Sequence, residues 1–263
     1  MRNYMIRRLG HSIFIILGLM ALLFFSINVL GDPVELLVED EVSQEVIDAI
    51  RAKYGFDRPL HVRFGDFYWN MVRGDFDVSI RHKIPARELV FGRLPNTAVL
   101  GLVTWAIGSL GIPIGMLAAR RPRGLVDRLI NIFSFAVISV PDFWLALMLI
   151  LILAVEFHLL PTSGFNGLGP EGWKYVLLPA IALSPRVLGR NAQITRATMI
   201  DELGKGYVST ARAKGLTQRR VLYGHVFRNA MLIVIAGFPS AFISILFTST
   251  LLIEIIFSLD GLG

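Results

Sequence analysis

Four long apolar runs limit what this chain can fold into. Each reaches the roughly 20 residues that a helix needs to cross the hydrocarbon of a bilayer. A soluble fold would leave such faces without a packing partner, since ordinary core helices are shorter and keep a polar stripe. The runs are Leu9–Leu30, Thr97–Ala119, Leu129–Val155 and Ala230–Phe257. We therefore predict an all-α fold, a polytopic transmembrane helical bundle.

Charge and cysteine content narrow the class of protein further. Charged side chains make up 17% of the chain, where a soluble domain has about a quarter. The chain has no cysteine, which excludes disulfides and thiolate metal sites. Its net charge of +6 comes from basic clusters beside the apolar runs, which is typical of cytoplasmic anchors in a membrane. We expect the lipid bilayer as a partner and no nucleic acid.

Three basic clusters predict the orientation in the membrane. One precedes the first apolar run (Arg2 to Arg8), one follows the second (Arg120–Arg128), and the third covers Arg186–Arg228. By the positive-inside rule all three face the cytoplasm, which places the N-terminus inside. Segment 31–95 holds more acids than bases and is expected outside. The first run is too long for the apolar part of a cleaved signal peptide, so we interpret it as a retained span.

The alternation of sides requires a further span between the third apolar run and the last basic cluster. Trp173 and Tyr175 mark its outer end, and Val176–Leu188 is largely apolar. This gives five spans, with the final segment Phe257–Gly263 outside the membrane and no helix after it. We expect that a sixth span is missing from this sequence.

We expect three parts along the chain: an N-terminal transmembrane helix (1–30), an extracytoplasmic insert (31–95) and a membrane core (96–263). The core carries a basic cytoplasmic loop at about 201–228. In the insert, Ser43 is predicted to cap a helix that Gly55 ends.

A second short helix is predicted in the insert, from Pro59 to a point before Gly74. It has large side chains at helical spacing, which favours packing inside the insert over a contact surface for an extracytoplasmic partner, though both stay open. These side chains are Phe64, Phe67, Tyr68 and Met71.

The basic loop contains its own helix signals. We predict a short helix over Tyr207–Lys214, and Gly215 can supply a left-handed cap at its end. Thr217 is then predicted to cap a second helix with an apolar stripe at Val221, Leu222 and Val226. The first helix suits either insertion into a cleft on a cytoplasmic partner or a position on the bilayer surface, and the residues alone leave these alternatives open.

The loop resembles the EAA loop of ABC-importer permeases in the dipeptide and oligopeptide family, most of all the Dpp/Opp B-type and Yej-type subunits. Its sequence Thr210-Ala-Arg-Ala-Lys-Gly-Leu216 is similar to theirs, and the resemblance covers nearly the whole chain. The other shared motifs are Ile6-Arg-Arg8, Gly31-Asp-Pro33, Tyr54-Gly-Phe-Asp-Arg-Pro59, Gly74-Asp75, Leu94-Pro-Asn-Thr97, Ser139-Val-Pro-Asp-Phe-Trp144, His225-Val-Phe-Arg-Asn-Ala-Met231, Ala236-Gly-Phe-Pro239 and Phe257-Ser-Leu-Asp-Gly-Leu-Gly263.

The sequence departs from this family in two places. Members continue past the final glycine into a last helix, which agrees with the missing sixth span. Their usual Gly-Asp-x-Gly turn here reads Gly74-Asp75-Phe76-Asp77, which puts the local external turn in doubt.

The resemblance implies a type I ABC-importer permease fold in a bacterial or archaeal cytoplasmic membrane. It implies a subunit that forms half of a translocation pathway for di- or oligopeptides. The implied partners are a second homologous permease subunit, two ATPase subunits and an extracytoplasmic substrate-binding protein. The residues expected to couple to the ATPase are Tyr207, Ser209, Thr210, Ala211, Arg212, Ala213, Lys214, Gly215, Leu216 and Arg219.

The chain lacks the motifs that an enzyme of this kind would need. It contains no Gly-x-x-x-x-Gly-Lys-Ser/Thr loop to hold ATP phosphates, and its five histidines are scattered without metal-ligand spacing. We therefore expect no cofactor in this chain, with ATP and magnesium bound by a separate ATPase subunit.

Arg186 is the one cation expected within a span, where an unpaired charge is costly. It can line the pathway and meet a peptide carboxylate, or it can cap carbonyls that Pro185 leaves without donors. Acidic residues near kinks or span ends are expected to be interfacial, and four prolines are expected to bend helices. The acids are Asp142, Glu156 and Glu254, and the prolines are Pro113, Pro141, Pro179 and Pro239.

Other functions remain as alternatives. An ion-coupled secondary carrier would need paired intramembrane carboxylates or inverted repeats, and the sequence shows neither. A passive membrane scaffold is excluded only by ATP-dependent transport in the assembled complex. Within the permease hypothesis, nickel, glutathione or a peptide antibiotic are alternative cargoes to peptides.

Overall fold

The computed structural model describes residues 2–29, 55–79, 82–164 and 171–263, with fragments at 47–48, 51–52 and 169, and gives only the backbone at 2, 29, 248 and 249. The described residues are helices and their connections, with one isolated bridge between Val78 and Pro85 and no longer strand. This confirms the all-α prediction. The chain divides into two compact units, 1–91 and 92–263, which are described separately.

The first unit is built on two helices, α1 (Arg2–Val29) and α3 (Leu60–Arg73). Their contact centres on Phe24, which is buried and whose ring lies within 5.5 Å of the rings of Phe64 and Phe67. The hydroxyl of Tyr68 donates to the carbonyl oxygen of Leu17. The aromatic residues predicted to pack inside the insert therefore pack against the first apolar helix.

Glycine and aspartate shape the ends of α3. Gly55 has a φ of +69° before the helix, as its predicted role as a helix terminator requires. Gly74 ends α3 with a φ of +74°. Asp77, which replaces the glycine of the related motif, has a φ of +58°, so the departure in sequence falls at a left-handed position. The predicted Ser43 cap and most of its helix lie outside the described residues.

The second unit starts within α4 (Ala86–Gly108) and continues through eleven further helical segments to its end. Several are separated only by a change from α- to π-helical hydrogen bonding. They are α5 (Gly111–Ala119), α6 (Leu125–Ser139), α7 (Asp142–Leu149), η1 (Ile150–Glu156), α8 (Trp173–Leu203), α9 (Gly206–Ala213), α10 (Gln218–Arg220), η2 (Val221–Val226), α11 (Phe227–Ser244), η3 (Ile245–Ser249) and α12 (Thr250–Phe257).

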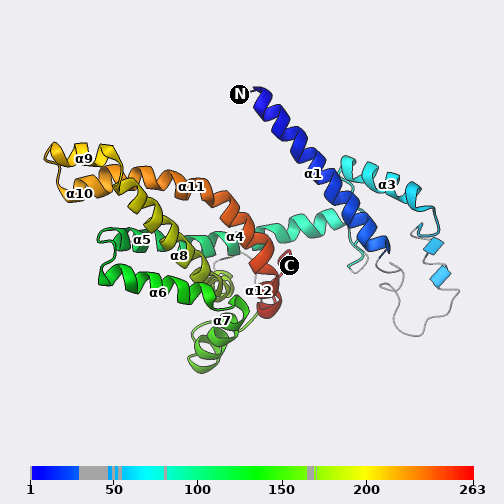
Figure 1. Ribbon diagram of the computed structural model, residues 1–263. Coiled ribbons are helices and arrows are strands. Elements are labelled where there is room, and N and C mark those ends of the chain that lie inside the picture. Colours follow the sequence, from blue (N-terminus) through cyan, green and yellow to red (C-terminus); the bar gives the residue numbers. More distant parts are fainter. Residues whose placement is uncertain are drawn as a thin grey trace. The chain divides into compact units, whose positions relative to one another are not determined.

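Helix α8 is the centre of this unit, with α5, α6, α7 and α11 packed against it (Figure 1). Two glycines bring α5 and α8 close together. A Cβ atom on Gly111 would lie 2.1 Å from the carbonyl oxygen of Leu188, and one on Gly115 would lie 2.3 Å from that of Ala192. This Gly-x-x-x-Gly spacing places both glycines on one helix face, where small residues let membrane helices approach.

Three described helices are long and apolar enough to cross a membrane: Asn3–Asn28, Ala86–Ala119 and Gln218–Phe247. The third apolar run, Leu129–Val155, is not one continuous helix, because Leu125–Ser139 and Asp142–Glu156 meet at an angle of 91°. Pro141, between them, has no amide hydrogen to continue the first helix, and its predicted bend is confirmed. Pro179 and Pro239 lie inside α8 and α11. The count of five spans stays a prediction.

Glu254 corrects the expectation that the acidic residues at span ends are interfacial. Its side chain is 2% exposed. It accepts a 2.6 Å hydrogen bond from the hydroxyl of Thr97 on α4, and another from the backbone amide of Gly263. The carboxylate thus joins α4, α12 and the turn after α12, because a buried acceptor of this kind must find donors inside the protein.

Candidate functional site

The predicted loop helix is present as α9, an eight-residue helix that begins after the extended residue Lys205. Its inner face is apolar. Val208 and Ala211 are buried and pack with Val221, Leu222 and Val226 of η2 in one apolar cluster. The stripe predicted for the second helix therefore has a definite partner, which is α9 itself.

The outer face of α9 is open to solvent. Gly215 and Arg219, which follow the helix, are exposed as well, whereas Tyr207 and Leu216 are half-buried. Ala211 differs from the rest of the predicted coupling residues, because it faces the protein interior. The exposed members on the helix are Ser209, Thr210, Arg212, Ala213 and Lys214.

The turn after α9 has the predicted chemistry. Gly215 has a φ of +78°, and its amide donates a 2.9 Å hydrogen bond to the carbonyl oxygen of Arg212. Glycine adopts this conformation without the steric cost of a side chain. The side chain of Thr217 then accepts a hydrogen bond from the amide of Arg220, so it caps α10 as expected.

Glu202 connects α9 to the end of α8. Its buried carboxylate accepts hydrogen bonds from the ammonium group of Lys205 and, at 2.6 Å, from the hydroxyl of Tyr207. The Lys205 hydrogen bond, followed by that of Tyr207, lowers the pKa of Glu202. Burial, followed by the hydrogen bond to Glu202, raises the pKa of Tyr207. Sequence reasoning missed Glu202, although its position three residues before a lysine is a signal for such a pair.

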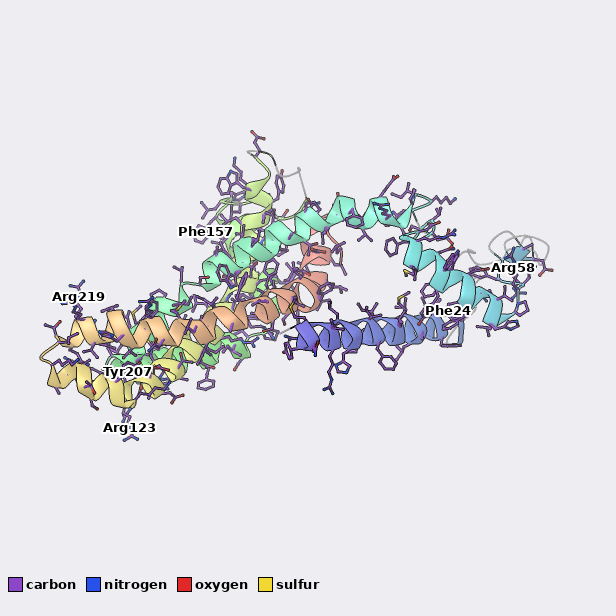
Figure 2. The ribbon with its side chains drawn as sticks, turned by 90° about the horizontal axis from the view of Figure 1, so that it is seen from above. Phe24, Arg58, Arg123, Phe157, Tyr207 and Arg219 are labelled. Carbon is purple, nitrogen blue, oxygen red and sulfur yellow. The ribbon has the colours of Figure 1, made fainter. Side chains whose placement is uncertain are left out.

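A second ion pair fixes the turn between α5 and α6. Asp127 is buried, and both of its carboxylate oxygens accept hydrogen bonds from the guanidinium group of Arg196 on α8. The distance from Nη2 of Arg196 to Oδ2 of Asp127 is 2.8 Å. The same oxygen accepts the amide hydrogen of Arg123, whose φ is +66°. Figure 2 shows Arg123, Tyr207 and Arg219 at the same end of this unit. The basic α5–α6 turn and the α9 segment therefore share one end of the bundle.

Arg186 has a partner that the sequence did not indicate. Its Nε donates to Oδ1 of Asp142 at 3.2 Å, and the arginine side chain is 51% exposed. Asp142 begins α7, so the pair joins α8 to the bent α6–α7 region. Among the described residues, the guanidinium group pairs with Asp142 and does not cap a backbone carbonyl near Pro185.

Comparison with known proteins identifies the family. Residues 111–263 match the family model described as "Binding-protein-dependent transport system inner membrane component". The oligopeptide transport system permease protein AppB of Bacillus subtilis is 37% identical over 271 residues, an alignment that includes all of this chain and 85% of AppB. The matched region includes the loop and α9.

Two further relatives carry other cargo names. The peptidoglycan transport system permease protein YejB of Agrobacterium fabrum is 41% identical over 83% of this chain and 64% of its own length. The glutathione transport system permease protein GsiC of Escherichia coli is 33% identical over all of this chain and 85% of its own length. The chain therefore belongs to the family of binding-protein-dependent inner-membrane permeases, as a multi-pass ABC-importer subunit that is not itself an enzyme.

Proposed function

We propose that this chain forms half of the translocation pathway of a peptide importer and that α9 docks on a separate ATPase. The observation that carries the proposal is the division of α9 into two faces. Val208 and Ala211 hold the helix on η2, while the small and basic side chains opposite them are exposed. A short helix held in this way can fit a groove on a partner and pass its displacement on.

The network around Glu202 supports this role. A force on α9 reaches α8 through the side chains of Tyr207 and Lys205, and α8 packs on α5, α6, α7 and α11. ATP binding would change the pathway only through contacts that differ between two states of the permease. The contact of α9 with the ATPase is where we place those differences.

The remaining parts of the assembly follow from the same proposal. The basic ends near α9 face the cytoplasm, with the N-terminus on that side. The complex contains a second homologous permease subunit, two ATPase subunits that bind ATP and magnesium, and an extracytoplasmic binding protein. The cargo is a di- or oligopeptide, because the relative that matches the whole chain at 37% identity is named for oligopeptide transport. The name of GsiC makes glutathione the second candidate.

Photo-crosslinking in the assembled transporter tests the docking. A photoreactive amino acid at Ser209, on the exposed face of α9, should crosslink to the ATPase subunit. The same group at Leu232, which is 67% exposed on α11, should not. Crosslinks from Ser209 only to lipid or to extracytoplasmic protein would overturn the proposal. Identification of the ligand of the co-purified binding protein tests the cargo.

A further inference from the structure

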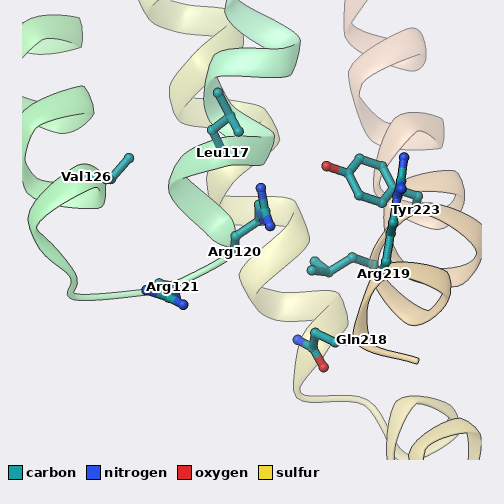
Figure 3. Close-up of a pocket in the computed structure, with 8 residues that line it drawn as sticks. Leu117, Arg120, Arg121, Val126, Gln218, Arg219 and Tyr223 are labelled. Atoms are coloured by element: carbon teal, nitrogen blue, oxygen red, sulfur yellow. The ribbon is translucent and has the colours of Figure 1, made fainter. Parts of the chain in front are cut away.

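A cleft of about 850 Å³ lies between the α5–α6 turn and the α10–η2 helix (Figure 3). Arg120 comes from the end of α5, and Arg219 and Tyr223 come from the opposite wall; Figure 3 shows them projecting into the same space. The lining residues are Leu117, Arg120, Arg121, Val126, Gln218, Arg219, Leu222 and Tyr223.

The lining of the cleft is positively charged, which favours an anionic ligand. Arg120, Arg121 and Arg219 are exposed, and none of them forms an ion pair with an acid in the described part of the chain. No aspartate or glutamate is among the lining residues. Guanidinium groups bind phosphate through paired hydrogen bonds, and Gln218 and Tyr223 add uncharged polar groups beside them.

The apolar part of the lining fits a ligand that carries hydrocarbon beside its anionic group. Leu117 and Val126 are exposed, and buried Leu222 lines the cleft from η2. The cleft also lies where two apolar helices end, since one stops at Ala119 and the other starts at Gln218. If both helices span the membrane, their ends lie near the phospholipid headgroups, whereas a soluble phosphate would leave the apolar wall without a partner.

Both walls of the cleft are held in place by interactions outside it. The α5–α6 turn is fixed by Asp127, which binds Arg196 and the amide of Arg123. The opposite wall is fixed by the Thr217 cap and by buried Val221. The arginines are therefore presented from a defined backbone, which reduces the entropy lost when a ligand binds.

We propose that this cleft binds the phosphate group of an acidic phospholipid of the cytoplasmic leaflet, with the acyl chains against Leu117 and Val126. The bound lipid connects the α5–α6 turn to the helix that follows α9. The proposal depends on the cytoplasmic orientation proposed above. The cleft shares Arg219 with the residues expected to couple to the ATPase, so the test changes only Arg120 and Arg121.

Native mass spectrometry of the assembled transporter tests this site. The complex is extracted from nanodiscs that contain phosphatidylglycerol in phosphatidylcholine, and the retained lipid is identified. The double variant Arg120→Gln/Arg121→Gln should retain at least about tenfold less phosphatidylglycerol, since the loss of even one charge-assisted hydrogen bond corresponds to about a factor of ten. Arg128→Gln is the matched control, because Arg128 is exposed on the same side and does not line the cleft.

Each result decides the proposal. Loss of phosphatidylglycerol in the double variant with retention in Arg128→Gln supports it. Equal retention in all three proteins, or equal loss in both variants, shows general charge attraction and overturns it. Displacement of the lipid by inorganic phosphate alone would identify a soluble anion and would also overturn it. A photoreactive group at Val126 should label lipid, and labelling of the ATPase in its place would show a protein interface.

Discussion

The hydroxyl of Tyr207 donates a 2.6 Å hydrogen bond to Oε2 of Glu202, which joins α9 to the end of α8. We expect Tyr207→Phe to lower the free energy of unfolding by about 1 kcal/mol, because it leaves a charged acceptor without one donor. Under the proposed function it should also lower the peptide imported per ATP hydrolysed. Thermal unfolding and a vesicle uptake assay measure the two effects. Tyr175→Phe, whose hydroxyl has no such partner among the described residues, should change neither.

The pKa of Glu202 predicts a dependence of stability on pH. Because Lys205 and Tyr207 lower this pKa, the folded state favours the carboxylate. Its stabilisation is complete above the unfolded-state pKa of about 4.3 and is lost as the pH falls through the lower folded value. The melting temperature of the wild type should therefore exceed that of Glu202→Gln near neutral pH, and the two should converge in acid. A difference that stays constant down to the acid limit would contradict this.

The positive φ of Gly215 predicts an asymmetric response to substitution. Gly215→Ala should cost about 1 kcal/mol because an L-residue is disfavoured at +78°. Gly215→Pro should be worse, since proline fixes φ near −65° and loses the amide hydrogen that reaches Arg212. Both variants should insert in the membrane, and the proline variant should hydrolyse ATP without transport. Gly224→Ala is the control, because its new Cβ would meet only the Arg220 side chain, at 4.0 Å. Wild-type transport by Gly215→Pro would refute the docking role.

The close approach of α5 and α8 predicts that Gly111 does not accept a side chain. Gly111→Val would place its Cβ 2.1 Å from the carbonyl oxygen of Leu188 and should cost about 3 kcal/mol. Resistance to heat and protease in detergent measures the loss. Gly18→Val on α1 has no atom within 4 Å of the new Cβ and should be tolerated far better.

The ion pair between Arg186 and Asp142 makes it possible to test whether the arginine stabilises the bent span or binds cargo in the pathway. If the pair fixes the bent span, Arg186→Gln and Asp142→Asn should each lower stability by about 0.5–1 kcal/mol, and the double variant should be no worse than either. A double-mutant cycle of melting temperatures measures this coupling. Unchanged stability, together with lower uptake of acidic peptides only in Arg186→Gln, would favour the pathway role.

The local chemistry of the α9 region followed from the sequence. The Gly215 turn, the Thr217 cap and the apolar stripe of η2 depend on backbone conformation and on side chains a few residues apart, and each is present. The bend in the third apolar run followed from Pro141, but its angle of 91° did not, because a proline interrupts a helix without fixing the direction of the next one. The burial of Glu254 was missed for a similar reason: its donor Thr97 lies 157 residues away in the chain.

The sequence by itself determined that this chain is a helical membrane protein and which permease family it belongs to. The lengths of the apolar runs and the sequence motifs can both be read without knowing how the helices pack. The tertiary structure decided which charges are paired. Asp127 meets Arg196, Asp142 meets Arg186, and Arg120 faces Arg219 across an open cleft. Which charges meet depends on how helices distant in sequence pack. The glycines of α5 permit the close contact with α8, which leaves no room for a side chain at those positions.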